Sequence, residues 1–302
     1  MENESNKFVF VILHYYTIAD TIKCVNSIKD NINSNECEIV IVDNASPNQT
    51  GEKLKEIYRK IENIHVIINE KNLGFAKGNN VGFLYAKKEL KAEYIILLNN
   101  DTVILQKNFL KLVVQEFKES KFAVLGPKIL LLNNEVNPLI LELPNLKKVQ
   151  KQLFDIRLDL ITNYLWINGL YKNIRQAIKK ILIKLKLKTN KEKIKENCID
   201  KKHENIVLHG SFLIFSKEYI EKFDGLDDRT FLYREEELLA IRLKKNNLKS
   251  VYNPEIKIFH NEDGATNAMN KNNRKKQIFV SKNLIKSTKI LIDEMSVKEK
   301  KK

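Results

Sequence analysis

The chain has 302 residues, of which 43% are hydrophobic and 30% are charged. That apolar content can bury a sizeable core, which excludes a largely disordered chain, and only 9 glycines and 5 prolines exclude collagen-like or low-complexity architectures. The net charge of +15 invites three kinds of partner, namely nucleic acid, an anionic membrane surface or an anionic small molecule.

The positive charge is concentrated in two segments. Residues 147–202 carry 16 basic and 5 acidic side chains, residues 271–302 carry 11 basic and 3 acidic ones, and the rest of the chain is net −4. A nucleic-acid-binding protein would carry its charge on the folded binding face, so we expect no nucleic-acid partner. Residues 170–188 combine an apolar stripe with flanking lysines, which favours contact with an anionic membrane surface through both segments. A solvated helical insertion or a subunit contact is the alternative.

Nothing in the sequence indicates export or a membrane span. No apolar run reaches the roughly 18 residues that a transmembrane helix needs, and the polar N-terminus leads directly into an apolar run. The three cysteines form no CxxC pair, so we expect neither a disulfide framework nor a zinc site. We therefore expect a cytoplasmic protein that can lie peripherally at the inner membrane face.

Strands and helices alternate in the first part of the chain. Continuous apolar runs predict buried strands, and apolar residues at helical spacing predict the helices between them. The predicted strands are 8–14, 38–42, 64–68, 94–98 and 122–125, and the predicted helices are 18–30, 51–62, 75–90 and 107–118. This alternation predicts an α/β fold with a mostly parallel sheet flanked by helices, in which ligands bind at the carboxyl ends of the strands.

The middle of the chain interrupts this alternation. Residues 130–205 are rich in Lys and Asn and have helical spacing between Leu170 and Leu185, although 183–188 could also alternate as a strand. After them we predict a strand at 206–215 interrupted by Gly210, helices at 216–222 and 235–246, strands at 249–252 and 256–260, and a basic amphipathic helix at 271–291. We therefore expect one domain over 1–270, with about 130–205 as a variable basic insertion, followed by a basic helix and tail over 271–302.

Polar side chains follow the second and fourth predicted strands. Asp43 could accept hydrogen bonds from a nucleobase imide or a ribose hydroxyl, although helix capping by the residues after it is the simpler interpretation. Asn99-Asn100-Asp101 ends the fourth strand, and its carboxylate could hold a divalent cation against a diphosphate. The alternative is a structural role, because Asn, Asp and Thr are also common in turns and at helix N-caps.

The segment from Asn72 to Asn80 contains two glycines and three amides around a helix start. Because a helix N-terminus offers free N–H groups, this segment could cradle a nucleotide or a sugar, with Lys77 on a phosphate. An ordinary loop is the alternative.

Three further motifs lie after the insertion. Glu235, Glu236 and Glu237 open a helix, where the dipole favours acids, but one of them could instead be a general base walled off by the preceding aromatics. His260 at a strand end could contact a metal or a phosphate, although a lone histidine there is more often neither. Gly210 marks either a close backbone approach or a sheet irregularity.

The order and spacing of these motifs resemble the family 2 glycosyltransferases of GT-A fold, specifically the rhamnosyltransferase-like branch. The resemblance covers about 8–130 and 205–265. The matching stretches are 9–15, 39–46, 72–82, 97–102, 209–212, 231–242 and 253–260.

The resemblance implies a role for each motif. Glu236 would be the catalytic base, with Glu235 as its rival, and Asp101 and His260 would hold Mg²⁺ or Mn²⁺. The first position of the family's D-x-D triplet is Asn99 here, so one carboxylate remains. The donor-binding residues would be Asp43, Asn44, Asn72, Gly74, Lys77, Asn80, Asn99 and Asn100. The residues on the acceptor side would be His209, Gly210, Ser211 and Tyr233.

The resemblance implies an inverting transfer of sugar from a UDP- or dTDP-linked donor to a hydroxyl of a glycan or lipid-linked acceptor in cell-surface polysaccharide synthesis. One alternative is a degenerate nucleotide-sugar-binding module. The other is a nucleotidyltransferase of similar fold, which would normally have a Gly-rich basic loop after the first strand. Residues 14–20 contain no glycine.

Overall fold

The structure is a computed structural model that describes residues 7–131, 135–167, 198–261 and 273–296. The chain divides into two compact units, one formed by Met1–Leu143 with Lys202–Met269 and the other by Pro144–Lys201 with Asn270–Lys302. Each unit is described by itself below. None of the helices in the described part of the chain is both long enough and apolar enough to cross a membrane.

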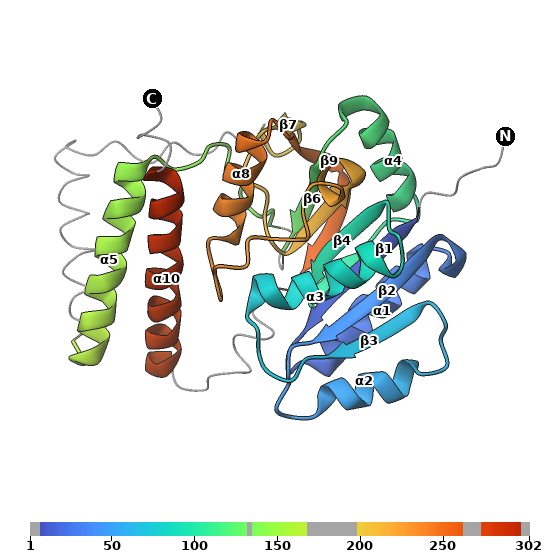
Figure 1. The fold of residues 1–302 in the computed structure, drawn as a ribbon, viewed down its shortest axis with the longest axis horizontal. Coiled ribbons are helices and arrows are strands. Elements are labelled where there is room, and N and C mark those ends of the chain that lie inside the picture. Colours follow the sequence, from blue (N-terminus) through green and yellow to red (C-terminus); the bar gives the residue numbers. More distant parts are fainter. Residues whose placement is uncertain (1–6, 132–134, 168–197, 262–272, 297–302) are drawn as a thin grey trace. The chain divides into compact units, whose positions relative to one another are not determined.

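The larger unit is built on a sheet whose first half is parallel (Figure 1). Strand β1 lies between β2 and β4, and β3 extends the sheet beyond β2. These strands are β1 (Phe8–His14), β2 (Cys37–Asp43), β3 (Ile64–Ile68) and β4 (Tyr94–Asn99). Because the four strands are parallel, their carboxyl ends meet at one edge, as the sequence predicted.

The second half of the sheet is mixed. Strand β8 is antiparallel to β4, β6 is antiparallel to β8, and β9 is parallel to β6 and carries the short strands β5 and β7. These strands are β5 (Thr102–Ile104), β6 (Val124–Leu130), β7 (His203–Glu204), β8 (Phe212–Ser216) and β9 (Ser250–His260). The resulting order is β3-β2-β1-β4-β8-β6-β9-β5.

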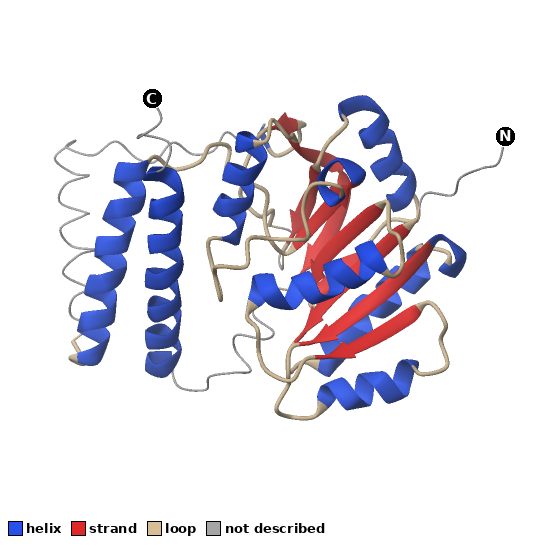
Figure 2. Ribbon diagram, in the orientation of Figure 1, coloured by secondary structure: helices blue, strands red, loops and turns tan. Residues whose placement is uncertain are grey.

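Both faces of the sheet are covered by helices, which gives three layers (Figure 2). Alternate residues of β1 show this, because Phe8, Phe10 and Ile12 pack in one apolar cluster while Val9 and Val11 pack in the other. The first cluster includes residues of α1 (Ile18–Asn31), α2 (Thr50–Tyr58) and α4 (Phe109–Ser120), and the second includes residues of α3 (Phe75–Lys88), α7 (Lys217–Ile220) and α8 (Glu235–Lys245). Each fully buried large side chain contributes about 1.5–3 kcal/mol.

Two strand predictions were wrong. The predicted strand at 206–215 begins only at Phe212, because the Gly210 N–H donates to the Glu236 carboxylate instead of to a neighbouring strand. The predicted strands at 249–252 and 256–260 are one continuous strand, β9, whose partner β6 absorbs a register shift between Pro127 and Lys128. A short 3-10 turn at Ser34–Glu36 precedes β2.

The smaller unit contains two helices that pack side by side, α5 (Leu146–Tyr164) and α10 (Asn273–Ser296). Helix α5 was not predicted, whereas α10 confirms the predicted C-terminal helix with bounds a few residues later. Arg274 donates to the carbonyls of Asn163 and Tyr164 at 2.7 and 3.0 Å, which satisfies the C-terminus of α5. The helical spacing predicted between Leu170 and Leu185 lies outside the described residues.

Candidate active site

The candidate site lies at the carboxyl edge of the parallel strands. His14 at the end of β1 is in register with Asp43 at the end of β2, and Leu13 is in register with Asn99 at the end of β4. Asp43 is almost fully buried, and both of its carboxylate oxygens accept the Ser46 N–H, at 3.3 and 3.2 Å. The Ser46 hydroxyl also donates to Asp43, at 2.5 Å, so this carboxylate is held in one orientation.

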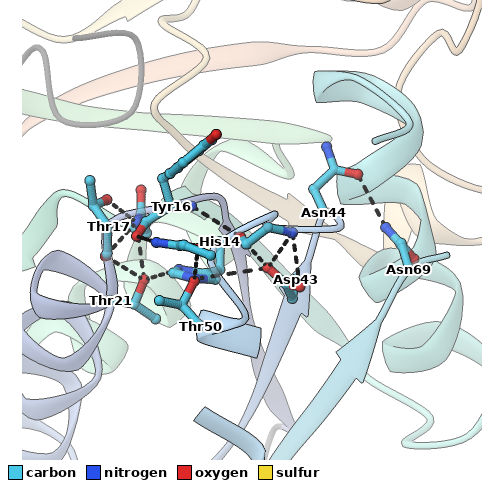
Figure 3. A network of polar contacts seen from close by, with 11 residues as sticks. His14, Tyr16, Thr17, Thr21, Asp43, Asn44, Thr50 and Asn69 are labelled. Atoms are coloured by element: carbon cyan, nitrogen blue, oxygen red, sulfur yellow. Dashed lines mark hydrogen bonds and ion pairs between the residues drawn. The ribbon is translucent and has the colours of Figure 1, made fainter. Parts of the chain in front are cut away.

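His14 joins several of these elements through a buried polar network (Figure 3). Its Nε2 lies 2.8 Å from the Thr50 hydroxyl, which donates in turn to Asn48, so Nε2 carries the proton of the neutral ring. Its Nδ1 accepts from the Thr21 hydroxyl at 2.7 Å, and Asp43 Oδ1 lies 3.8 Å from Nε2. Burial lowers the pKa of His14, which the nearby Asp43 opposes, so the ring is neutral.

Asn44 shapes the loop that follows β3. Its Nδ2 donates to the Asn72 side chain and to the Gly74 carbonyl at 3.1 and 3.0 Å, and its Oδ1 accepts from the Leu73 N–H at 2.9 Å and from Asn69 at 3.3 Å. Asn44 and Asn72 therefore hydrogen-bond to each other and to the backbone of the loop. These hydrogen bonds fix the conformation of the segment that the sequence predicted to cradle the donor.

Gly74 lets this loop approach the segment before α8. It has a φ of +81°, and a Cβ at this position would lie 2.2 Å from the Phe231 carbonyl oxygen. The next N–H, of Phe75, donates to that same oxygen at 2.7 Å. Only glycine combines this backbone conformation with such close contact.

Two other residues predicted to bind the donor lie along α3. Asn80 accepts the Leu226 N–H at 2.7 Å and donates to the Leu226 carbonyl at 2.9 Å, so its amide fastens the 225–226 turn to the helix. Lys77 is exposed in the first turn of α3. The donor role of these residues stays a prediction.

The side chain of Asn100 and the backbone of Asn99, in the Asn99-Asn100-Asp101 turn, contact different parts of the site. Asn100 is buried and donates to the hydroxyls of Thr17 and Thr21 at 2.9 and 3.0 Å, so it belongs to the His14 network. The Asn99 N–H donates to the Ser211 carbonyl at 2.9 Å, which ties the turn to the His209-Gly210-Ser211 segment.

Asp101 faces His260, with 3.2 Å between Oδ1 and Nε2, and the two side chains are 10% and 7% exposed. Apart from this contact, Asp101 Oδ1 and His260 Nδ1 are buried without a hydrogen-bond partner in the described residues. Unsatisfied buried polar atoms of this kind fit a bound divalent cation. In the described part of the chain no three His, Cys, Asp or Glu side chains are arranged so that together they could hold a metal ion, so this pair would supply only part of a coordination shell.

The three consecutive glutamates at the start of α8 have different surroundings. Glu235 is buried and accepts from the Thr230 hydroxyl at 3.0 Å, and Glu237 pairs with Arg234 at 2.6 Å. Glu236 keeps 29% of its side chain exposed, and its Oε1 accepts the Gly210 N–H at 2.6 Å. Burial raises the pKa of both Glu235 and Glu236 to about 7, although the hydrogen bonds that the two carboxylates accept lower it in part.

Left-handed backbone sets the orientation of these glutamates. Tyr233 and Arg234 have φ values of 73° and 71°, so the chain turns sharply just before the helix begins. Such conformations cost about 1–3 kcal/mol each in non-glycine residues and cluster at functional sites.

His209 lies between Glu236 and His260. Its Nε2 is 4.0 Å from Glu236 Oε1, and its ring centre is 5.9 Å from that of His260. Burial lowers the pKa of His209 to about 4, and the neighbouring His260 adds to the effect. A continuous set of groups thus runs from Glu236 through His209 and His260 to Asp101.

The structure brings together Asp101, His260, His209 and Glu236, which the sequence placed on four separate motifs. It also joins Asp43 to Asn100 through His14 and Thr21, two residues to which the sequence assigned no role. A histidine at the end of the first predicted strand was the available signal. Thr21 lies inside a predicted helix and gave none.

Comparison with known proteins identifies the family. The model of glycosyl transferase family 2 matches residues 10–182, more than half of the chain. This chain belongs to glycosyl transferase family 2.

The family 2 chain has curated relatives of low identity. It is 29% identical over 97 residues to the low-salt glycan biosynthesis hexosyltransferase Agl10 of Haloferax volcanii, covering 32% of this chain and 30% of the relative. It is 28% identical over 122 residues to the dTDP-rhamnosyl transferase RfbF of Shigella flexneri, covering 40% and 38%. The family 2 chain therefore spans about a third of the length of these relatives.

Solved structures show that the family 2 chain has the GT-A fold. S. aureus TarS 1–349 in complex with UDP-GlcNAc aligns over 85% of this chain and 59% of its own, with a TM-score of 0.53 and 18% identity. GalNAc-T7 with UDP, GalNAc and Mn²⁺ aligns over 86% and 44%, with a TM-score of 0.57 and 14% identity. These likenesses confirm the predicted fold class, and the family model confirms the predicted family.

Proposed function

We propose that the chain transfers a sugar, with inversion at the anomeric carbon, from a UDP- or dTDP-linked donor to a hydroxyl of a glycan or lipid-linked acceptor in cell-surface polysaccharide synthesis. The observation that carries the proposal is the placement of Glu236. It is a partly exposed carboxylate with a pKa of about 7, set beside His209 and in one polar set with Asp101 and His260. The relatives named as hexosyl- and rhamnosyltransferases and the neighbour solved with UDP-GlcNAc support this donor class.

In the proposed reaction Glu236 takes the proton of the acceptor hydroxyl as that oxygen bonds to the anomeric carbon. The bond from this carbon to the diphosphate oxygen breaks on the opposite face, and its electron pair leaves with the nucleoside diphosphate. Asp101 and His260 would hold a divalent cation, which when bound supplies positive charge for the leaving diphosphate. Asp43, whose carboxylate is held in place by the Ser46 N–H and hydroxyl, would orient the nucleobase or the ribose.

The direct test is the pair of variants Glu236→Gln and Glu235→Gln. A screen of nucleotide sugars for binding and hydrolysis first identifies the donor. Glu236→Gln should then lower the transfer rate by about 10²–10⁴-fold, the usual contribution of a general base, with the affinity for the nucleoside diphosphate nearly unchanged. NMR of the product reports the anomeric configuration.

Glu221→Gln, an exposed glutamate after α7, is the matched control and should keep full activity. Full activity in Glu236→Gln together with loss in Glu235→Gln would move the base to Glu235. Full activity in both would overturn the assignment of a base at the start of α8.

We also propose that the chain is cytoplasmic and binds the inner membrane face peripherally. Phe154 and Ile161 of α5 and Leu165 just after it are 60%, 52% and 60% exposed, which is unusual for large apolar side chains spaced seven and four residues apart. Helices α5 and α10 coincide with parts of the basic segments 147–202 and 271–302. Exposed apolar side chains among lysines and arginines suit the surface of an anionic bilayer.

A further inference from the structure

A small apolar cavity borders the proposed base. It has a volume of about 30 Å³, and its wall is made mainly of apolar side chains, with polar groups from Asn137, His209, Glu236 and Tyr252. Ile129 from β6 and Val207 from the segment before Gly210 form its buried part, and Leu139 closes it from the segment after β6. The cavity exceeds what one water molecule needs but is too small for a sugar ring.

The composition of the wall selects the occupant. A buried water is held by two to four hydrogen bonds, whereas side chains such as Ile129, Leu139 and Val207 offer none. A compact apolar group fits such a wall better than a hydroxyl, because an unpaired hydroxyl in an apolar site loses its hydrogen bonds with water.

His209 presents a hydrogen-bond donor beside this cavity. Its Nδ1 accepts the Ser211 N–H at 3.2 Å and lies 2.8 Å from the Ser211 hydroxyl. The neutral ring therefore carries its proton on Nε2, the nitrogen that lies 4.0 Å from Glu236 Oε1. A hydrogen-bond donor and the proposed base thus stand side by side at the polar part of the cavity.

We propose that the acceptor carries a methyl group close to the hydroxyl that attacks, either the methyl of a deoxy sugar or that of an N-acetyl group. The methyl enters the cavity beside Val207, the attacking hydroxyl meets Glu236, and a neighbouring oxygen accepts the His209 Nε2–H. This inference rests on the proposed function and adds the class of acceptor to it.

The test compares acceptors in matched pairs, once the donor has been identified by hydrolysis. Methyl α-L-rhamnoside is paired with methyl α-L-mannoside, and a glycoside of N-acetylglucosamine is paired with that of glucosamine. The wild-type enzyme should prefer the methyl-bearing member of one pair by about 10-fold or more in kcat/KM, the discrimination that one well-fitted small apolar group supplies. The pair that shows the preference identifies the source of the methyl.

Val207→Leu fills the cavity and should reduce this preference to near unity. Val207→Ala enlarges it and should shift the preference toward an N-propanoyl or ethyl analogue. Val66→Leu on β3, which does not line the cavity, should leave the preference and the donor hydrolysis unchanged.

Equal use of both members of each pair by the wild-type enzyme, including use of neither, would overturn the inference. A preference that persists in both Val207 variants would overturn it as well. If the wild-type chain neither binds nor hydrolyses any nucleotide sugar, the proposed function itself fails, and that outcome is distinct from failure of the acceptor assignment.

Discussion

At the scale of single residues, environment separates side chains that are chemically identical. Glu235, Glu236 and Glu237 are consecutive, yet one is buried against Thr230, one is partly exposed beside His209, and one pairs with Arg234. Helical geometry turns each residue to a different direction. Only a carboxylate that reaches an open space can exchange a proton with a substrate, and this condition favours Glu236.

The pKa of about 7 for Glu236 predicts how activity depends on pH. A general base must be ionised, so kcat/KM for the acceptor should rise with pH, reach half of its maximum near pH 7, and fall tenfold per pH unit well below that. A pH profile of kcat/KM, measured over a range of acceptor concentrations, checks this. A flat profile between about pH 5 and 8 would contradict a base with this pKa.

The same raised pKa predicts a stability effect with a defined sign. Because folding raises the pKa from 4.5 to about 7, the protonated carboxyl stabilises the fold below pH 4.5, and this contribution is lost as pH rises through 7. Glu236→Gln should therefore be more stable than the wild type by about 1–3 kcal/mol at pH 8, with the difference shrinking toward pH 4.5. Urea unfolding at the two pH values measures it.

His14 predicts a second effect at this scale. His14→Leu removes one hydrogen-bond partner from each of the buried hydroxyls of Thr21 and Thr50, which keep their other partners, so the free energy of unfolding should fall by about 1–3 kcal/mol. His14→Gln can keep one hydrogen bond and should lose less. Chemical denaturation gives the stability, and calorimetry with UDP reports whether Asp43 and Asn100 stay in place. His65→Gln, a half-buried histidine on β3, is the control and should change both quantities little.

At the scale of elements, loops that belong to different strands fasten one another. The Phe75 N–H and the Phe231 carbonyl join the loop after β3 to the segment before α8. This contact joins the loop that includes Asn72, a predicted donor residue, to the segment that leads into α8 and Glu236. It exists because Gly74 leaves room for the Phe231 carbonyl.

Gly74→Ala should therefore affect stability and binding together. The new Cβ would lie 2.2 Å from the Phe231 oxygen in a left-handed conformation, so we expect a loss of about 2 kcal/mol or more in stability and weaker UDP binding. Lys91→Gly, at an exposed left-handed position with a φ of 54°, is the control. It should stabilise the protein slightly or have no effect. Unchanged stability in Gly74→Ala would contradict this prediction, because it would mean that the contact between Phe75 and the Phe231 carbonyl does not stabilise the fold.

At the scale of the whole molecule, charge and catalysis occupy different parts of the chain. The residues outside the segments 147–202 and 271–302 are net −4, and they include every candidate catalytic residue. The basic excess therefore lies outside the candidate site, and the membrane association proposed above would account for it.

Vesicle flotation tests this separation. The chain should float with vesicles that contain phosphatidylglycerol and stay unbound with pure phosphatidylcholine, and raising the salt from about 0.1 to 0.5 M should weaken the binding. The double variant Phe154→Ser with Ile161→Ser should bind more weakly, whereas Leu105→Ser, an exposed leucine of the larger unit, should not. Absence of binding to anionic vesicles at low salt would overturn the membrane proposal.

The sequence predicted the parallel strands well because their apolar runs are continuous, and all of them except the edge strand β3 are buried on both faces. It failed where tertiary contacts decide, as at 206–211, where Gly210 turns its N–H to Glu236 and leaves the sheet. It also missed α5, although Val149, Leu153, Ile156 and Leu160 recur there at helical spacing. The role of Asn100 in the His14 network had no signal, because Asn in a turn after a strand is common in any loop.

The four parallel strands, the polar residues at their carboxyl ends and the resemblance to family 2 follow from the sequence by itself, because they depend on local pattern and motif spacing. The sheet order, the distances among Asp101, His260, His209 and Glu236, the surroundings of His14 and the cavity beside Val207 depend on residues from different elements of the fold. Only the folded sheet brings such residues together, since burial and hydrogen-bond partners are properties of the packed chain.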